Sequence, residues 1–107
     1  MNIRNIPMVK VTWNDAQDSD GGWTSLEDIL AHEPAVCQEV GWLVHQDDTK
    51  IIVMRSRICT GDELEEGGAH IAIPTDWVTK IEKLKVEVED EENNIFSTNS
   101  YQSVHAR

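Results

Sequence analysis

One stretch decides the fold: Ile71-Ala72-Ile73-Pro74-Thr75-Asp76-Trp77-Val78-Thr79-Lys80-Ile81. An apolar strand stops there at a proline, and a second apolar segment begins three residues later. Pro74 ends the first strand because it has no N–H group to donate to a neighbouring strand. The next three residues fit a single 3₁₀ turn, and Val78 and Ile81 resume as buried strand residues. Small β-barrels turn a corner in this way, so the stretch predicts an all-β domain.

Alternation of apolar and polar residues predicts further strands on both sides of this corner. The predicted strands are residues 8–14, 35–44, 50–59, 70–73 and 78–85. Turn-forming residues 46–49 join the second and third strands into a hairpin. Gly41 interrupts the second strand and predicts a bulge or bend. The third strand is expected to turn Ile52, Met54 and Ile58 toward the core.

The connections are polar and acidic. Residues 14–22 are predicted to form a loop, and Thr24-Ser25-Leu26-Glu27 matches a capping box at the start of a helix. Pro34 stops this helix, so it is short, and Leu26, Ile29 and Leu30 lie on one side of it. Residues 61–68 are predicted to form a second acidic loop, bounded by glycines.

The chain of 107 residues has the length of one domain, and its 39% hydrophobic and 27% charged residues are ordinary for a globular protein. Its formal net charge of −11 repels phosphate backbones and anionic membranes, so no direct nucleic-acid wrapping and no membrane partner is expected. The same charge suits a basic partner, an imitation of a nucleic-acid surface or solvation alone. Four of the six aromatic residues are tryptophans, which predicts core and rim packing or a ligand platform.

Three regions follow from these patterns. Residues 1–7 form an N-terminal arm, residues 8–86 the folded domain, and residues 87–107 an acidic, polar tail that is expected to be disordered. The tail begins with five acids in six positions. These candidate partner-binding residues are Glu87, Glu89, Asp90, Glu91 and Glu92.

The chain reads as an intracellular, soluble protein. It has no secretory signal pattern and no apolar run approaching 18 residues. Cys37 and Cys59 are too few for a disulfide framework and are expected to be reduced.

No recognised catalytic motif is present. His32, His45, His70 and His105 lack metal-ligand spacing with one another or with the cysteines. Asp15, Asp18 and Asp20 follow the rhythm of a calcium loop loosely, without its distal glutamate. Nucleophile elbows, phosphate loops and dinucleotide fingerprints are absent from the sequence. We therefore expect no catalytic residue, no metal and no cofactor.

Two arginines stand out in this acidic chain. Arg55 and Arg57 are two residues apart on a predicted strand and project from one face. They are suited either to grip one anionic ligand or to form ion pairs with the acidic loop at residues 63–66. Trp23 and Trp42 are candidates to stack on such a ligand. The predicted ligand-binding residues are Arg55, Arg57, Trp23 and Trp42.

Four segments carry a resemblance that spans roughly residues 9–84. They are Val9-Lys10-Val11-Thr12-Trp13-Asn14-Asp15-Ala16, Gly22-Trp23-Thr24-Ser25-Leu26-Glu27, Val40-Gly41-Trp42-Leu43-Val44 and Ile73-Pro74-Thr75-Asp76-Trp77-Val78. The chain resembles the small accessory proteins of unassigned role that tailed phages encode, and its corner at Pro74 is similar to the last corner of SH3-like barrels. The resemblance implies a phage protein located in the cytoplasm of an infected bacterial host. The aromatic motifs of peptide-binding SH3 domains are missing, so recognition of proline-rich peptides is not expected.

The expected fold is mainly β: a five-stranded, mostly antiparallel SH3-like barrel with one short helix and a flexible C-terminal tail. The expected function is that of a non-catalytic phage accessory protein that binds a host protein and acts on host machinery or defence. The alternative is an oligomeric binder, or sponge, of a small anionic ligand such as a nucleotide, since open sheet edges favour homo-oligomers. An enzyme is the third and weakest class.

Overall fold

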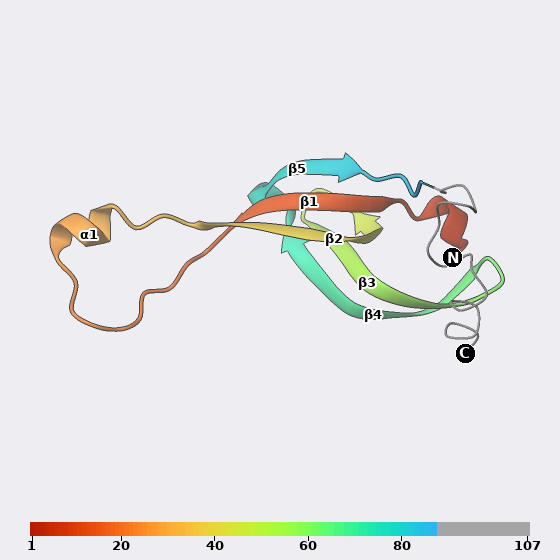
Figure 1. Ribbon diagram of the computed structural model, residues 1–107, viewed down its shortest axis with the longest axis horizontal. Helices are drawn as coiled ribbons and strands as arrows, with labels where there is room; N and C mark the ends of the chain where they lie inside the picture. Colours follow the sequence, from red (N-terminus) through yellow and green to blue (C-terminus); the bar gives the residue numbers. More distant parts are fainter. Residues whose placement is uncertain (88–107) are drawn as a thin grey trace, which may run out of the picture.

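The computed structural model describes residues 1–87, which form one five-stranded antiparallel sheet and one short helix (Figure 1). The elements in chain order are η1 (Ile3–Asn5), β1 (Met8–Asp15), α1 (Leu26–Leu30), β2 (Ala35–Gln46), β3 (Lys50–Thr60), β4 (Glu63–Pro74), η2 (Thr75–Trp77) and β5 (Val78–Lys83). The strands lie in the order β4-β3-β2-β1-β5. The predicted mainly β class, the strand number and the short helix are confirmed.

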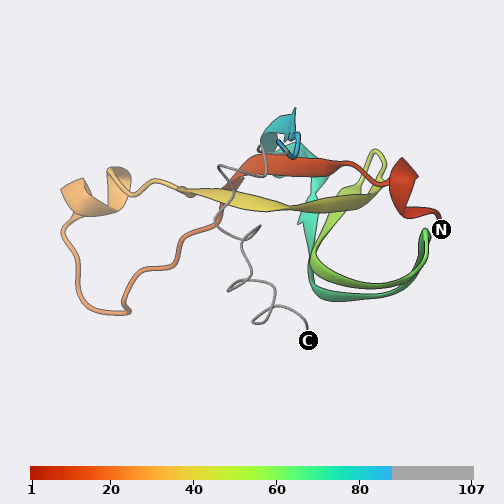
Figure 2. The same cartoon turned by 45° about the vertical axis from the view of Figure 1, so that its right-hand side comes forward.

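The sheet does not close into a barrel, so this part of the fold prediction is wrong. β4 and β5 are the two edges of the sheet. Pro74 ends β4 without an N–H group to offer, and η2 then redirects the chain so that β5 pairs with β1. Figure 2 shows the β3–β4 hairpin curving away beneath β1 and β2. The strong curvature therefore bends the sheet without joining its edges.

The core lies on one face of β1, whose side chains alternate as the sequence predicts. Val9, Val11 and Trp13 are buried, whereas Lys10 and Thr12 on the opposite face are half-buried. β1 pairs with β2 on one side and with β5 on the other. The buried cluster consists of Val9, Val11, Trp13, Ile51, Val53 and Ile73. β1 thus links the curved β3–β4 hairpin to the last strand.

The predicted corner is present and is tied to the β2–β3 turn. Thr75 donates its N–H to the carbonyl of Thr49 (3.0 Å) and its hydroxyl to the carbonyl of Asp47 (2.8 Å). The carboxylate of Asp47 also accepts bonds from His45 and from the amides of Thr49 and Lys50. These bonds hold the pKa of Asp47 well below its ordinary value, and the bond from His45 has the largest effect. The turn is therefore organised by one ionised side chain.

Two details of the β3–β4 hairpin differ from the prediction. Residues 61–68 are not a loop, because β3 and β4 stay paired as far as Thr60 and Glu63. The inward residues of β3 include Ile51 and Val53, whereas Ile58 is 61% exposed. β3 pairs with β2 only as far as Met54, which is buried as predicted, and the far end of the hairpin curves away from the core (Figure 2).

The N-terminal residues pack against the β3–β4 turn. Ile3 donates its N–H to the carbonyl of Asp62, and Leu64 donates its N–H to the carbonyl of Met1. Arg4 forms an ion pair with Asp62 at 3.0 Å. Ile6 is buried.

The close approach of β2 to β3 requires a glycine at position 41. A methyl group there would collide with the carbonyl oxygen of Met54 and lie 2.8 Å from Cγ1 of Val53. We expect Gly41→Ala to lower the free energy of unfolding by about 2 kcal/mol, measured by urea denaturation, because overpacking forces the strands apart.

Gly68→Ala is the matched control, since its added methyl group meets only Cβ of Ser56 at 3.6 Å. We expect this variant to unfold within about 0.5 kcal/mol of the unmodified protein. Equal destabilisation by the two substitutions would show that the contact at Gly41 does not limit the packing.

Candidate functional site

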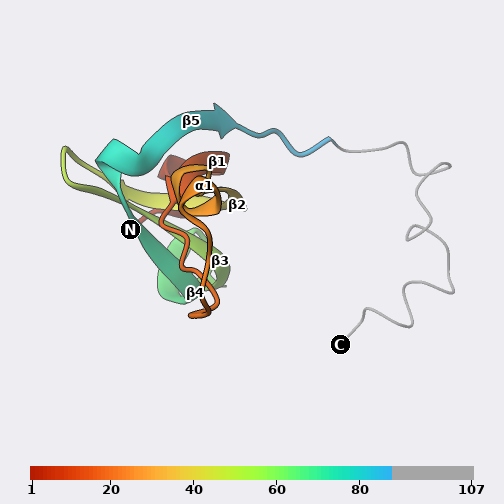
Figure 3. The same cartoon turned by 90° about the vertical axis from the view of Figure 1, so that its left-hand side faces the viewer.

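A long projection leaves the sheet between β1 and β2. The two strands pair as far as Asp15 and Ala35, and residues 16–34 then extend away from the sheet (Figure 1). We call residues 16–34 the projection. The fold measures 62 × 32 × 22 Å, and Figure 1 shows that the projection occupies one end of its longest axis. Figure 3, which looks along this axis, shows α1 in front of β1 and β2.

Short-range hydrogen bonds shape the projection. Gly22 donates its amide to the carboxylate of Asp20 at 2.9 Å, which makes a local turn. α1 is capped by Ser25, whose hydroxyl accepts the amide of Asp28 at 3.1 Å. The N-cap is therefore Ser25 and not Thr24 as predicted. The hydroxyl of Thr24 instead contacts the carbonyl of Gly22 at 3.5 Å.

The apolar side chains of the projection have no core to enter. α1 buries none of its residues. Trp23 is fully exposed, with a relative accessibility of 107%, and the three apolar residues of α1 are 55–76% exposed. These three residues are Leu26, Ile29 and Leu30. The predicted apolar side of the helix therefore exists, but it faces solvent.

The projection carries charge of one sign. It has five acidic residues and no lysine or arginine. Within residues 1–87, none of its carboxylates forms an ion pair. A hollow of about 560 Å³ is lined by projection residues alone, Trp23, Ile29, Asp18 and Asp28 among them. The projection thus combines an apolar surface with uncompensated negative charge.

Arg55 is held by a carboxylate of the neighbouring strand. Its Nε donates to Oε2 of Glu39 at 2.5 Å, and its Nη2 donates to Oε1 at 2.8 Å. This bidentate bond from Arg55 lowers the pKa of Glu39 below its ordinary value. Arg55 therefore forms an ion pair within the sheet, the structural alternative that the sequence left open, although its partner is not in the predicted loop.

Arg57 has a different environment. Its guanidinium lies over the ring of Trp42, 4.2 Å from the ring centroid. Within residues 1–87 it forms no ion pair, and its Nη1 atom is buried without a hydrogen-bond acceptor. A hollow of about 190 Å³ beside it is lined by Ser56, Arg57, Ile58, Glu66, Gly67 and Gly68.

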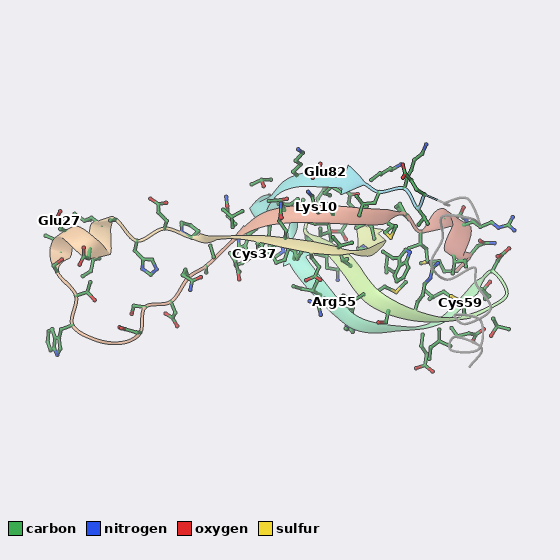
Figure 4. The ribbon with its side chains drawn as sticks, viewed as in Figure 1. Lys10, Glu27, Cys37, Arg55, Cys59 and Glu82 are labelled. Atoms are coloured by element: carbon green, nitrogen blue, oxygen red, sulfur yellow. The ribbon has the colours of Figure 1, made fainter. Side chains whose placement is uncertain are left out.

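The four predicted ligand residues thus fall in three places. Arg57 and Trp42 come together, whereas Trp23 lies in the projection and Arg55 is paired with Glu39. Figure 4 shows the separation through its labels, with Glu27 on α1 at one end and Arg55 in the sheet. Sequence reasoning missed the exposed apolar side of α1 as a candidate surface. The signal for it was the 19-residue connection between two paired strands, which is unusually long.

Glu87 is exposed, and the acids at positions 89–92 lie outside the described residues. Residues 1–87 contain no group of three or more side chains placed to hold a metal ion. Cys37 and Cys59 are free and half-buried. The described part of the chain has no helix with the length and apolarity needed to cross a membrane.

Comparisons of the chain with protein-family models, with curated proteins and with solved structures found no match.

The bond between Arg55 and Glu39 predicts a pH-dependent stability. The pKa of Glu39 is lowered in the folded state, so its ionised form stabilises the fold above the unfolded-state pKa of about 4.3, and this contribution disappears as the pH falls through the folded-state pKa. We expect Glu39→Gln to lower the unfolding temperature at pH 7, and the difference from the unmodified protein to shrink toward pH 3.

Glu82→Gln is the control, because Glu82 makes looser contacts with Lys10 (3.4 Å) and Lys80 (3.6 Å). We therefore expect Glu82→Gln to lower the unfolding temperature at pH 7 by less than Glu39→Gln does. A difference for Glu39→Gln that stays constant from pH 7 to pH 3 would contradict this role for the carboxylate.

Proposed function

We propose that this protein is a non-catalytic binding protein and that the projection is its contact element for a host protein. One observation carries the proposal: Trp23 and the apolar side of α1 stand exposed at the end of the projection. Monomeric soluble proteins rarely expose clustered large apolar residues without a use for them. Tryptophan in particular is enriched among the residues that dominate binding energy at protein interfaces.

The way in which the sheet holds the projection supports the same proposal. β1 and β2 are anchored in the core and hold the base of the projection, so the contact element is displayed at a distance from a stable body. Binding residues are commonly carried in this way on a loop positioned by a rigid scaffold. The role proposed for the chain is that of a phage accessory protein with an SH3-like topology, acting in the cytoplasm of an infected bacterium.

The register of β1 and β2 offers a direct test of the projection. Asp15 and Ala35 are paired, so an Asn-Gly turn can replace residues 16–34 with little strain on the hairpin. We expect this variant to unfold at the same urea concentration as the full chain or at a higher one, because α1 buries none of its residues and a shorter loop costs less entropy to close. We also expect it to lose the proteins that the tagged full chain retains from a bacterial lysate, as quantified by mass spectrometry.

The comparison contains its own control, since the two proteins share the whole sheet. Retention of the same proteins by the full chain and by the Asn-Gly variant would refute the projection as the contact element. A large loss of stability in the variant would assign the projection a structural role instead.

A second candidate function is the binding of a small anionic ligand, and the environment of Arg57 favours it. The guanidinium is oriented by Trp42, has no carboxylate partner within residues 1–87 and borders a hollow of about 190 Å³. A hollow of this size suits a phosphate or carboxylate group better than a whole nucleotide, because drug-sized ligands occupy about 300 Å³ or more. Arg57 lines this hollow and would hold the group, whereas Trp42 is not part of the lining and would orient the guanidinium.

Inorganic phosphate and adenosine monophosphate are suitable probes for this second function. We expect both to shift the NMR signals of the Arg57 Nε–H and the Trp42 indole N–H in a saturable manner, and Arg57→Gln to abolish the response of Trp42. Lys83→Gln removes one positive charge from β5 and serves as the control. An unchanged Trp42 response in Arg57→Gln would exclude the site, and a response to the nucleotide alone would show that the base contributes.

A further inference from the structure

We infer that the partner surface of the projection is basic, with lysine or arginine side chains around an apolar depression. This inference rests on the proposed function and specifies the chemistry of its partner. It follows from the charge of the projection together with the shape of its end.

The projection belongs to a long acidic part of the chain. Residues 11–49 contain nine acidic residues and no lysine or arginine, so the negative charge is not confined to the loop but extends into the strands that carry it. In the described part of the chain, only Glu39 and Asp47 of these nine have a paired cationic or histidine side chain. The carboxylates of the projection therefore attract a cationic surface, and cations there would offset part of the desolvation cost of burying these carboxylates.

The hollow in the projection combines apolar and acidic side chains. The hollow at the end of the projection has apolar walls from Trp23 and Ile29 and carboxylates from Asp18 and Asp28. Its volume of about 560 Å³ accommodates a long side chain. Lysine and arginine have apolar stems and charged ends, and an indole ring attracts a cation over its face. A basic side chain of the partner therefore matches both the walls and the charge of the hollow.

A second copy of this chain is the alternative occupant, and its charge disfavours it. Two copies would each bring a net charge of −11, and their projections would meet carboxylate against carboxylate. Like charges brought together at an interface cost several kcal/mol. Burial of the same apolar side chains against a basic partner avoids this repulsion, so the charge selects a different protein as the occupant.

A photo-reactive residue tests this inference in the full chain. Gln17, which lines the hollow without supplying its apolar walls or its carboxylates, is replaced by p-benzoylphenylalanine. The protein is irradiated in a bacterial lysate, and cross-linked peptides are identified by mass spectrometry. We expect the cross-linked peptides to be rich in lysine and arginine. We also expect the cross-link yield to fall at least fivefold between 50 and 500 mM NaCl, because salt screens exposed charges.

Two triple variants with equal changes in net charge complete the design. One neutralises three acids of the projection (Asp18→Asn, Glu27→Gln, Asp28→Asn), and the other neutralises three exposed acids outside it (Asp48→Asn, Glu65→Gln, Asp76→Asn). None of these six side chains makes a hydrogen bond or ion pair within residues 1–87. At 50 mM NaCl we expect the first variant to lose most of the cross-link and the second to retain it.

The outcomes separate this inference from the proposed function. A specific cross-link to another protein that is insensitive to salt and equal in both triple variants would overturn the basic partner while leaving the projection as the contact element. A cross-link to a second copy of the chain would overturn the choice of occupant. No cross-link above that of a probe placed at Thr79 of β5 would overturn both proposals.

Discussion

Burial of one face of β1 is the constraint on which the rest of the structure depends. A chain of this length can bury only a small core, and here that core is built on three alternating residues of one strand, Val9, Val11 and Trp13. β2 and β5 flank this strand, and the curved β3–β4 hairpin supplies Ile51, Val53 and Ile73. The corner at η2 matters because it returns the chain to β1 after β4. Without that return, one side of β1 would have no partner.

The same constraint accounts for the exposed projection. Trp13 is the last buried residue of β1, and the strand ends two positions later at Asp15. Residues beyond that point have no opposing sheet to pack against, so the apolar side of α1 cannot enter the core. Each apolar side chain left exposed forgoes roughly 1.5–3 kcal/mol of burial free energy. A contact with another molecule is the means by which that free energy can be recovered.

The features that were predictable from the sequence depend on neighbouring residues. The break at Pro74, the 3₁₀ turn after it and the hairpin at residues 46–49 follow from backbone restrictions that a few residues impose. Closure of the sheet was not predictable, because it depends on how far β3 curves. That curvature also left Ile58 exposed at the far end of the strand. The candidate residues Arg55 and Arg57 were found by type and spacing, but their partners depend on where β2 lies.

The two arginines of β3 have different partners because they lie at different positions along the curved strand. Arg55 meets Glu39 of the neighbouring strand β2, and both charges are satisfied by one bidentate bond. Arg57, two residues further along the curve, meets the ring of Trp42 instead of a carboxylate. Stacking orients a guanidinium without neutralising it, so a bound anion would supply the negative charge that the ring lacks. The projection and the Arg57 hollow are built from different residues, and so either one can bind its own partner without the other.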